Sequence, residues 1–240
     1  PPRSTLFPYT TLFRSVSYPC WATFPYFSTG AGESAHKDIA ANDFSLLKTG
    51  DPDGKYWMPA MSDAPLRGYN GRHEWFWEPG DEKNIFPLEN LVEMYYKSVG
   101  RNSTLIIGLT PDADGLLPDP DVKRLKEFGS EIDRRFSNPL GSVGGNGNIH
   151  TIDLKQEKLV NHIVIQEDIR NGERIRQYKV EGLVNGKWKL LCHGESVGHK
   201  RIEEFPKAEC KKIRLTIEKS IAEPDIKVFA AFFISETQHH

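Results

Sequence analysis

The residues with the clearest chemical potential lie in one stretch, YWMPAMSDAPLRGYNGRHEWFWEPGDE, which runs from Tyr56 to Glu82. Three of the five tryptophans of the chain fall within it. The stretch also holds the charged or titratable residues Arg67, Arg72, His73, Glu74 and Glu78. Indole faces beside guanidinium and carboxylate groups suit the apolar and hydroxylated faces of a sugar. The stretch therefore predicts either a carbohydrate-binding loop or an aromatic loop that closes a buried core.

Composition places the chain among ordinary soluble globular proteins, with 38% hydrophobic and 27% charged residues. Its 240 residues are enough for two modest domains. The formal net charge of −2 gives no reason to expect nucleic acid or a membrane as a partner. No apolar run approaches the roughly 20 residues of a membrane span. The spacing of the three cysteines fits no metal site, and Cys192 and Cys210 form either two buried thiols or one bridge.

The first 15 residues, PPRSTLFPYTTLFRS, resemble translated sequencing-adapter text. They lack the cationic segment and long apolar core of a signal peptide. We therefore expect residues 1–15 to be artefactual or disordered and leave them out of the fold prediction.

Residues 16–136 predict part of an α/β fold. Tyr56–Met58 is a short strand candidate that ends at Pro59. A helix is expected after Pro87 because apolar residues recur at helical spacing, namely Leu88, Leu91, Val92, Tyr95 and Val99. The apolar run Thr104–Leu109 predicts a strand buried on both faces, as in a parallel sheet.

A second helix is expected to begin with Asp119 as N-cap and Pro120 as its first residue. The order helix, buried strand, helix is typical of a parallel α/β fold. A complete barrel of eight repeats needs roughly 200 residues, so about one and a half repeats predict only the last part of a barrel.

The segment SNPLGSVGGNGN, residues 137–148, predicts a linker because its glycines oppose regular structure. Short β-branched or aromatic runs follow, separated by turn signals: HTIDL, LVNHIVIQE, IRQYKVEGLV, KWKLLC, KRIEEF, KKIRLTIE and VFAAFFIS. This spacing indicates an antiparallel β-sandwich over residues 149–240. Asn185 and Gly186 form its sharpest hairpin signal, and Trp188 is expected in its core rather than on a lectin surface.

Residues 18–136 resemble the C-terminal half of the catalytic domain of the α-L-fucosidases, glycoside hydrolase family 29. The resemblance rests on YWMPAMSDAPLRG, on HEWFWEPGDE and most specifically on YYKSVGRNSTLIIGLTPDADGLL. From GNGNIHTIDL onward the chain is similar to the discoidin-like, galactose-binding-like β-sandwich that follows many of these barrels. The implied fold is α/β plus all-β, the C-terminal part of a (β/α)8-like barrel followed by an antiparallel β-sandwich.

The resemblance implies a retaining glycosidase that releases terminal L-fucose from fucosylated glycans, without a cofactor or metal. Such enzymes use an Asp nucleophile and a Glu acid/base roughly 5 Å apart. We expect the nucleophile's strand to precede this chain, which would make the chain an inactive fragment, and the full protein to be periplasmic or secreted. Where some relatives carry a glutamate in a WVPAE-type segment, this chain has Met58 and Met61.

The resemblance also implies substrate contacts at the positions of this chain that match those of the family. Arg67 matches an arginine that reaches the fucose region in relatives, and Trp75 or Trp77 matches an aromatic residue that packs on the C5/C6-methyl side of fucose. Glu74 is implied as a hydroxyl acceptor and as a weak acid/base candidate. For Glu78 a surface charge is favoured.

Two further loops give only weak signals. His36 and Glu33 lie in a loop that either rims the pocket or is simply solvated. The aspartates that follow Thr110 fail the EF-hand spacing, so no calcium loop is expected. The alternative to an enzyme fragment is a carbohydrate-binding or structural β-sandwich attached to an incomplete barrel.

Overall fold

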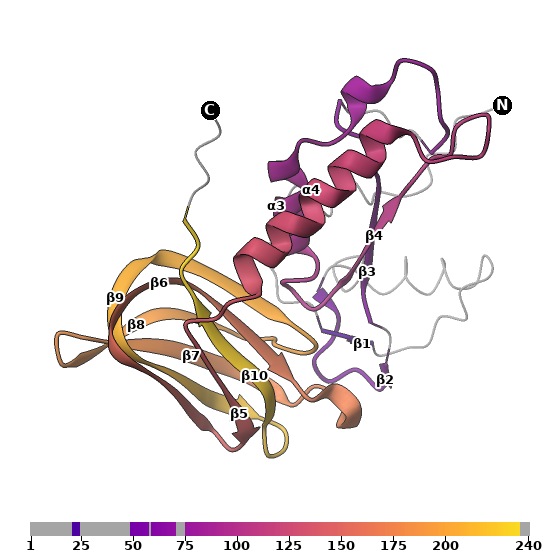
Figure 1. Cartoon of the computed structure of the whole chain (residues 1–240). Coiled ribbons are helices and arrows are strands. Elements are labelled where there is room, and N and C mark those ends of the chain that lie inside the picture. Colours follow the sequence, from indigo (N-terminus) through magenta and orange to yellow (C-terminus); the bar gives the residue numbers. More distant parts are fainter. Residues whose placement is uncertain (1–20, 25–48, 58, 71–74, 236–240) are drawn as a thin grey trace. The chain divides into compact units, whose positions relative to one another are not determined.

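The computed structural model describes residues 21–24, 49–57, 59–70 and 75–235. The chain divides into two compact units (Figure 1). The described residues of the first, which we call the βα unit, are 61–70, 75–99 and 103–137. Those of the second, the sheet unit, are 21–24, 49–57, 59–60, 100–102 and 138–235. Among the described residues, none of the helices is both long and apolar enough to span a membrane.

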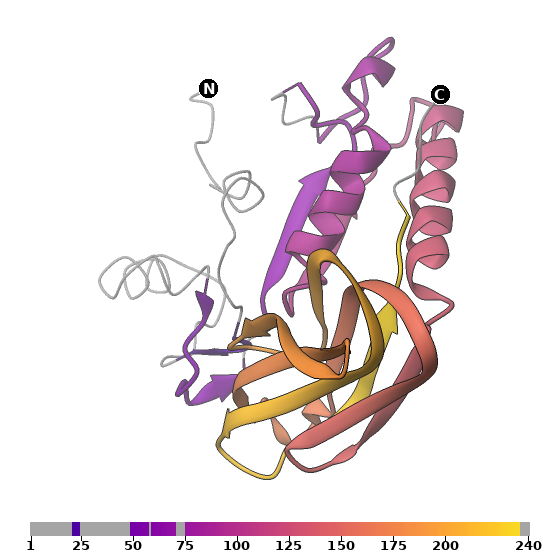
Figure 2. The same ribbon diagram turned by 90° about the vertical axis from the view of Figure 1, so that its left-hand side faces the viewer.

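The described residues of the βα unit include two parallel strands and two α-helices. The helices are seen from a second side in Figure 2. Strands β3 (Met61–Pro65) and β4 (Thr104–Gly108) pair in parallel over their whole lengths. Helix α3 spans Leu88–Lys97, α4 spans Asp119–Phe136, and the short 3-10 helix η2 spans Glu82–Asn84. The strands and α3 bury a small core of Ala64, Leu66, Leu91 and Met94, onto which Leu125 and Phe128 of α4 pack.

The βα unit matches most of the elements expected from its sequence. The predicted helix after Pro87 and the predicted strand from Thr104 are both confirmed. Helix α4 begins one residue earlier than predicted, because Pro118 takes the N-cap position and Asp119 is already helical. Strand β4 is not buried on both faces among the described residues, since Ile106 is 43% exposed. Strand β3 was not expected, because MSDAP has neither an apolar run nor strict alternation.

The sheet unit is built on one six-stranded sheet in the order β5-β10-β6-β9-β7-β8, and all its pairs are antiparallel. The strands are β5 (Gly141–Asn146), β6 (Ile149–Glu167), β7 (Ile175–Val184), β8 (Lys187–Gly194), β9 (Arg201–Ser220) and β10 (Asp225–Phe232). A 3-10 turn, η3 (Ile169–Asn171), follows β6. The sheet is strongly curved in Figure 1. A separate pair, β1 (Thr23–Phe24) and β2 (Tyr56–Trp57), completes the unit.

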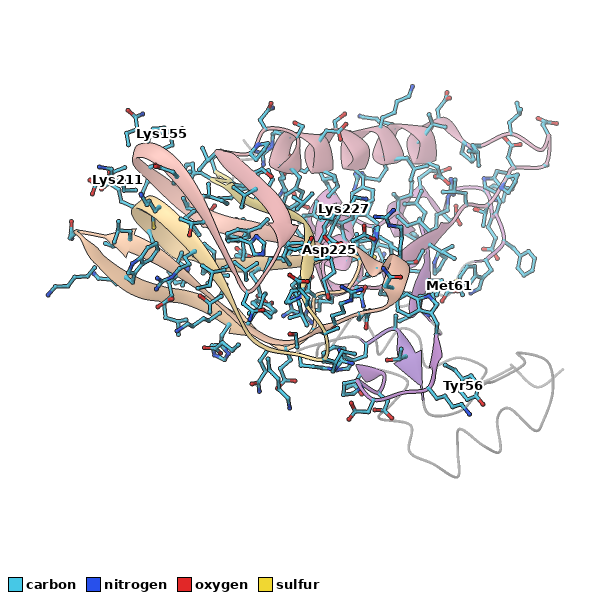
Figure 3. The ribbon with its side chains drawn as sticks, turned by 90° about the horizontal axis from the view of Figure 1, so that it is seen from below. Tyr56, Met61, Lys155, Lys211, Asp225 and Lys227 are labelled. Carbon is cyan, nitrogen blue, oxygen red and sulfur yellow. The ribbon has the colours of Figure 1, made fainter. Side chains whose placement is uncertain are left out.

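Two long strands account for the curvature of the sheet. The runs HTIDL and LVNHIVIQE form one strand, β6, and KRIEEF and KKIRLTIE form one strand, β9. Their pairing shifts register between Asp153 and Lys158, where Lys155 adopts a φ of 67°. Such bulges bend a strand and increase its twist. Lys155 and Lys211 lie on these two strands (Figure 3).

The hairpin signal at Asn185-Gly186 is confirmed. The two residues have φ values of 51° and 72°, and Val184 pairs with Lys187 across the turn. A two-residue turn with both φ values positive has the twist that matches antiparallel strands. Cys192 and Cys210 are both free thiols rather than a bridge.

Residues 137–148 are not only a linker. Strand β5 occupies half of this segment and pairs with β10. Its glycines allow close approach instead of preventing regular structure. A Cβ on Gly141 would lie 2.5 Å from Cγ2 of Ile152, and one on Gly144 would lie 2.8 Å from the carbonyl oxygen of Ile226. Both contacts are too short for any residue with a side chain.

The described N-terminal segment of the sheet unit is fastened by a buried carboxylate, Glu173, which is 4% exposed. The amide N–H of Ala22 donates to both of its oxygens at 3.0 and 3.3 Å, and the side-chain amide of Asn102 donates to Oε1. Burial raises the pKa of Glu173 to about 7; the hydrogen bonds and Arg176 oppose this rise, while the charge of Glu167 adds to it. One carboxylate therefore joins segments that lie far apart in sequence.

The stability of the sheet unit is expected to fall as pH rises from about 4.5 to 7. An unfolded glutamate releases its proton near pH 4.5, whereas Glu173 in the folded state keeps it to about pH 7. The folded state therefore binds more protons in this window, and its advantage is lost as pH rises through the folded pKa. Glu173→Gln cannot titrate, so its denaturant midpoint should depend less on pH between 5 and 8 than that of the parent chain. The exposed Glu204→Gln is the control, and equal slopes for parent and Glu173→Gln would contradict the prediction.

Candidate functional site

The carboxyl ends of β3 and β4 meet at one edge of the βα unit. Pro65 and Gly108, the last residues of the two strands, are register partners. The Leu66 N–H donates to the Gly108 carbonyl at 2.9 Å, which extends the pairing one residue further. In parallel α/β folds the loops at this edge hold the ligand. The loops that follow β3 and β4 are therefore the candidate ligand-binding loops.

The indole of Trp75 lies directly on the end of β4. A Cβ built on Gly108 would be 2.6 Å from Cζ3 and 3.1 Å from Cε3 of the ring. Only glycine leaves room for this packing. Trp75 is nevertheless 46% exposed, so much of its surface faces solvent. The arrangement holds an aromatic surface at the strand edge, where a ligand can reach it.

Two neighbours of Trp75 in the chain enlarge this aromatic surface. Phe76 is 84% exposed and Trp77 is partly buried. We call Trp75–Trp77 the aromatic segment. Tyr69 is half exposed and packs edge-on against Phe86, with ring centroids 5.9 Å apart. Large aromatic side chains this exposed are typical of binding surfaces rather than of folding cores.

Arg67 lies beneath this edge in a buried ion-pair cluster. Its side chain has no exposed surface. Its Nε donates to both carboxylate oxygens of Asp121 at 3.1 Å, and its Nη2 donates to Oδ1 of Asp121 at 2.8 Å. Its Nη1 donates to Asp81. The predicted contact of Arg67 with a sugar stays a prediction, and its enclosure between two carboxylates favours a structural role.

Several other residues singled out in the sequence fall outside the described residues. These are Glu74, with its neighbours Arg72 and His73, and Met58, Glu33 and His36. Glu78 is exposed. Met61 is 57% exposed at the first position of β3 (Figure 3). Pro65 is four positions further along the strand, about 13 Å at the usual rise, so Met61 lies at the opposite end of β3 from Trp75.

Sequence patterns did not reveal the roles of Gly108, Asp81 and Asp121. Gly108 reads as the end of an apolar run, and Asp121 as one of several acidic residues at a helix start. Each acquires its role from a residue far away in sequence. Within the described part of the chain, no group of three or more His, Cys, Asp or Glu residues is placed to hold a metal ion.

Comparison with known proteins points to one group of glycosidases, although no protein-family model matches the chain. A candidate α-L-fucosidase 1 of Oryza sativa subsp. japonica is 30% identical over 90% of this chain. The crystal structure of a candidate α-L-fucosidase from Bacteroides thetaiotaomicron is 54% identical over 93% of this chain, with a TM-score of 0.85. A family 29 fucosidase from Ruminococcus gnavus, solved in complex with fucose, is 25% identical over 79% of this chain, with a TM-score of 0.66.

These matches confirm the resemblance to the α-L-fucosidases of glycoside hydrolase family 29. The likeness extends to the fold, which is mostly antiparallel sheet with few helices among the described residues. The chain spans about half the length of its relatives, 46% of the rice protein, 49% of the Bacteroides chain and 44% of the Ruminococcus chain.

Gly108→Ala is expected to displace the indole of Trp75 while leaving the chain folded. The added methyl would lie 2.6 Å from the ring, and the half-exposed ring is free to move outward. Acrylamide quenching of tryptophan fluorescence measures this, with the contribution of Trp75 obtained by subtracting the signal of matched proteins that carry Trp75→Phe. We expect stronger quenching of Trp75 in the variant.

Gly129→Ala is the matched control for this substitution. No atom lies within 4 Å of a Cβ at Gly129, in the middle of α4. We expect unchanged quenching and roughly 0.5–1 kcal/mol of added stability, because alanine loses less conformational freedom in a helix. Identical quenching of Trp75 in the parent and in Gly108→Ala would show that the ring does not rest on Gly108.

Proposed function

We propose that this chain is part of a retaining α-L-fucosidase of glycoside hydrolase family 29, and that the aromatic segment contacts terminal L-fucose of fucosylated glycans. The half-exposed indole of Trp75 on Gly108 is the observation that carries the proposal. Support also comes from the Bacteroides relative and from the Ruminococcus fucosidase that was solved with fucose.

The chemistry of the sugar fits this edge of the βα unit. L-fucose is a 6-deoxy sugar, so its C5/C6 side is apolar while its ring hydroxyls are polar. An indole face covers such an apolar side well. We assign this contact to Trp75, with Trp77 as the second aromatic contact, and hydroxyl acceptance to Glu74. A retaining mechanism needs two carboxyl groups roughly 5 Å apart. We assign neither of these two carboxyl groups to a residue that the structure describes.

The proposal includes an architecture and a location. Residues 16–136 would form the C-terminal part of a (β/α)8-like barrel, which the parallel β3–β4 pair with α3 and α4 supports. Residues from β5 onward would form a galactose-binding-like β-sandwich, which the curved antiparallel sheet supports. No cofactor is part of the proposal. Following the family resemblance, we propose a periplasmic or secreted location for the full protein.

Trp188 does not support the alternative function, a carbohydrate-binding sandwich. Its ring is partly buried, and the Arg214 guanidinium lies 4.1 Å from the ring centroid. Arg214 also donates to Glu181 at 2.9 Å. One face of this indole is therefore occupied by a side chain of the same sheet.

Binding of free sugars by the 240-residue chain tests the proposal. We expect saturation-transfer NMR to detect L-fucose, and Trp75→Ala to weaken its affinity roughly tenfold to a hundredfold. This range corresponds to the loss of about 1–3 kcal/mol of contact, by analogy with burial of a large side chain. The same variant should weaken binding of D-arabinopyranose less, because this sugar lacks the C6 methyl of L-fucose.

Trp188→Ala is the matched control, because that indole lies in the sheet unit. It should leave the affinity for both sugars unchanged. If the parent chain shows no L-fucose contact, or if Trp75→Ala affects the two sugars equally, the assignment of Trp75 to the methyl side of fucose is wrong.

A further inference from the structure

Asp81 does not use its side chain in the way its position suggests. It is the N-cap of η2, and its backbone carbonyl accepts the Asn84 N–H at 2.9 Å. An aspartate at an N-cap usually accepts a backbone N–H with its carboxylate. Here the carboxylate makes no such bond and accepts from Nη1 of Arg67 instead. The side chain of Asp81 thus serves a contact with a residue 14 positions earlier.

Arg67 is itself held in one position. It follows β3 almost directly, and its Nε and Nη2 form a fork on the carboxylate of Asp121 in the first turn of α4. The side chains of Arg67 and Asp121 have no exposed surface. A bidentate guanidinium pair fixes orientation as well as distance. The remaining nitrogen is therefore presented to Asp81 from a rigid base, which a lysine ammonium could not provide.

Polar contacts hold the chain on both sides of the aromatic segment, and within the segment Trp75 packs on Gly108. The Tyr69 N–H donates to the Asn84 carbonyl at 2.9 Å, and the Asn70 side chain donates to Oδ1 of Asn84 at 3.0 Å. Asp81 follows the segment by four residues. Trp75 and Phe76 are 46% and 84% exposed, so burial contributes little to ordering them. Their placement therefore depends on their flanking contacts as well as on the packing of Trp75 against Gly108.

We propose that Asp81, held by Arg67, is a positioning residue that keeps the aromatic segment Trp75–Trp77 over the end of β4. A binding surface ordered before the sugar arrives does not lose that ordering entropy on binding. The effect that we expect from Asp81 on L-fucose affinity rests on the proposed function, whereas its expected effect on the order of the aromatic segment does not.

Hydrogen exchange measures the order of the segment without any sugar. Asp81→Ala removes the carboxylate, and Asp81→Asn keeps its volume in case the alanine variant does not fold. We expect at least tenfold faster exchange in peptides covering residues 75–81 and unchanged exchange in α4. Glu82→Gln is the matched control, because Glu82 is the next residue, is exposed and carries the same charge.

A double-substitution cycle with Trp75→Ala then asks whether Asp81 acts through the aromatic segment. Asp81→Asn should weaken L-fucose binding about tenfold in the parent chain and should cost clearly less once Trp75 is alanine, because only the contact of Trp77 then remains to be positioned. Independent effects would instead add. A positioning residue predicts this coupling, whereas a general loss of stability would weaken binding in both backgrounds.

The outcomes separate the two proposals. Unchanged exchange at residues 75–81 in the Asp81 variants, or equal acceleration across α4 in both of them, overturns the positioning role. Additive losses in the double-substitution cycle overturn it as well. If the parent chain does not bind L-fucose, the proposed function fails, and hydrogen exchange alone decides the role of Asp81.

Discussion

A buried guanidinium between two carboxylates sets the geometry of the βα unit. Arg67 follows β3, Asp121 lies in the first turn of α4 and Asp81 is the N-cap of η2, so one cluster fixes three segments that are 14 and 54 residues apart. Removing ions from water is costly, and only good geometry offsets that cost. A shifted arrangement would leave a buried charge unpaired, which is far more costly than a lost apolar contact. The cluster therefore specifies one arrangement of these segments more than it adds to their stability.

Close packing of neighbouring groups against the backbone of glycines is the second recurring constraint. Gly108 admits the indole of Trp75, Gly141 admits Ile152, and Gly144 brings β5 against β10. In sequence Gly141 and Gly144 look like breakers and Gly108 looks like part of an apolar run, because the neighbour that needs the space is not visible there. This is why β5 was expected to be a linker. At Gly141 and Gly144 the relevant property is the absence of a Cβ, whereas Gly145 and Gly147, with φ values of 120° and 110°, do use the backbone freedom of glycine.

Local patterns predicted those elements whose cause is itself local. The stripe on α3, the apolar run of β4 and the Asn185-Gly186 turn each depend on residues close together in the chain. Strand β3 was missed because its pairing with β4, rather than its own composition, makes it a strand. The bulge near Lys155 likewise hid the continuity of β6, since a register shift has no simple sequence pattern. The buried hydrogen bonds of Glu173 reach residues 71 and 151 positions away.

The role of Arg67 could not be predicted from its sequence context. An arginine in an aromatic, polar stretch has the same appearance whether it faces a sugar or two carboxylates. Burial separates these cases, because a side chain without exposed surface meets a ligand only if the structure rearranges. The aromatic segment has the opposite character, since Trp75 and Phe76 are 46% and 84% exposed. Sugar recognition needs both kinds of residue, since rings that touch a ligand must stay exposed and therefore depend on buried neighbours for their position.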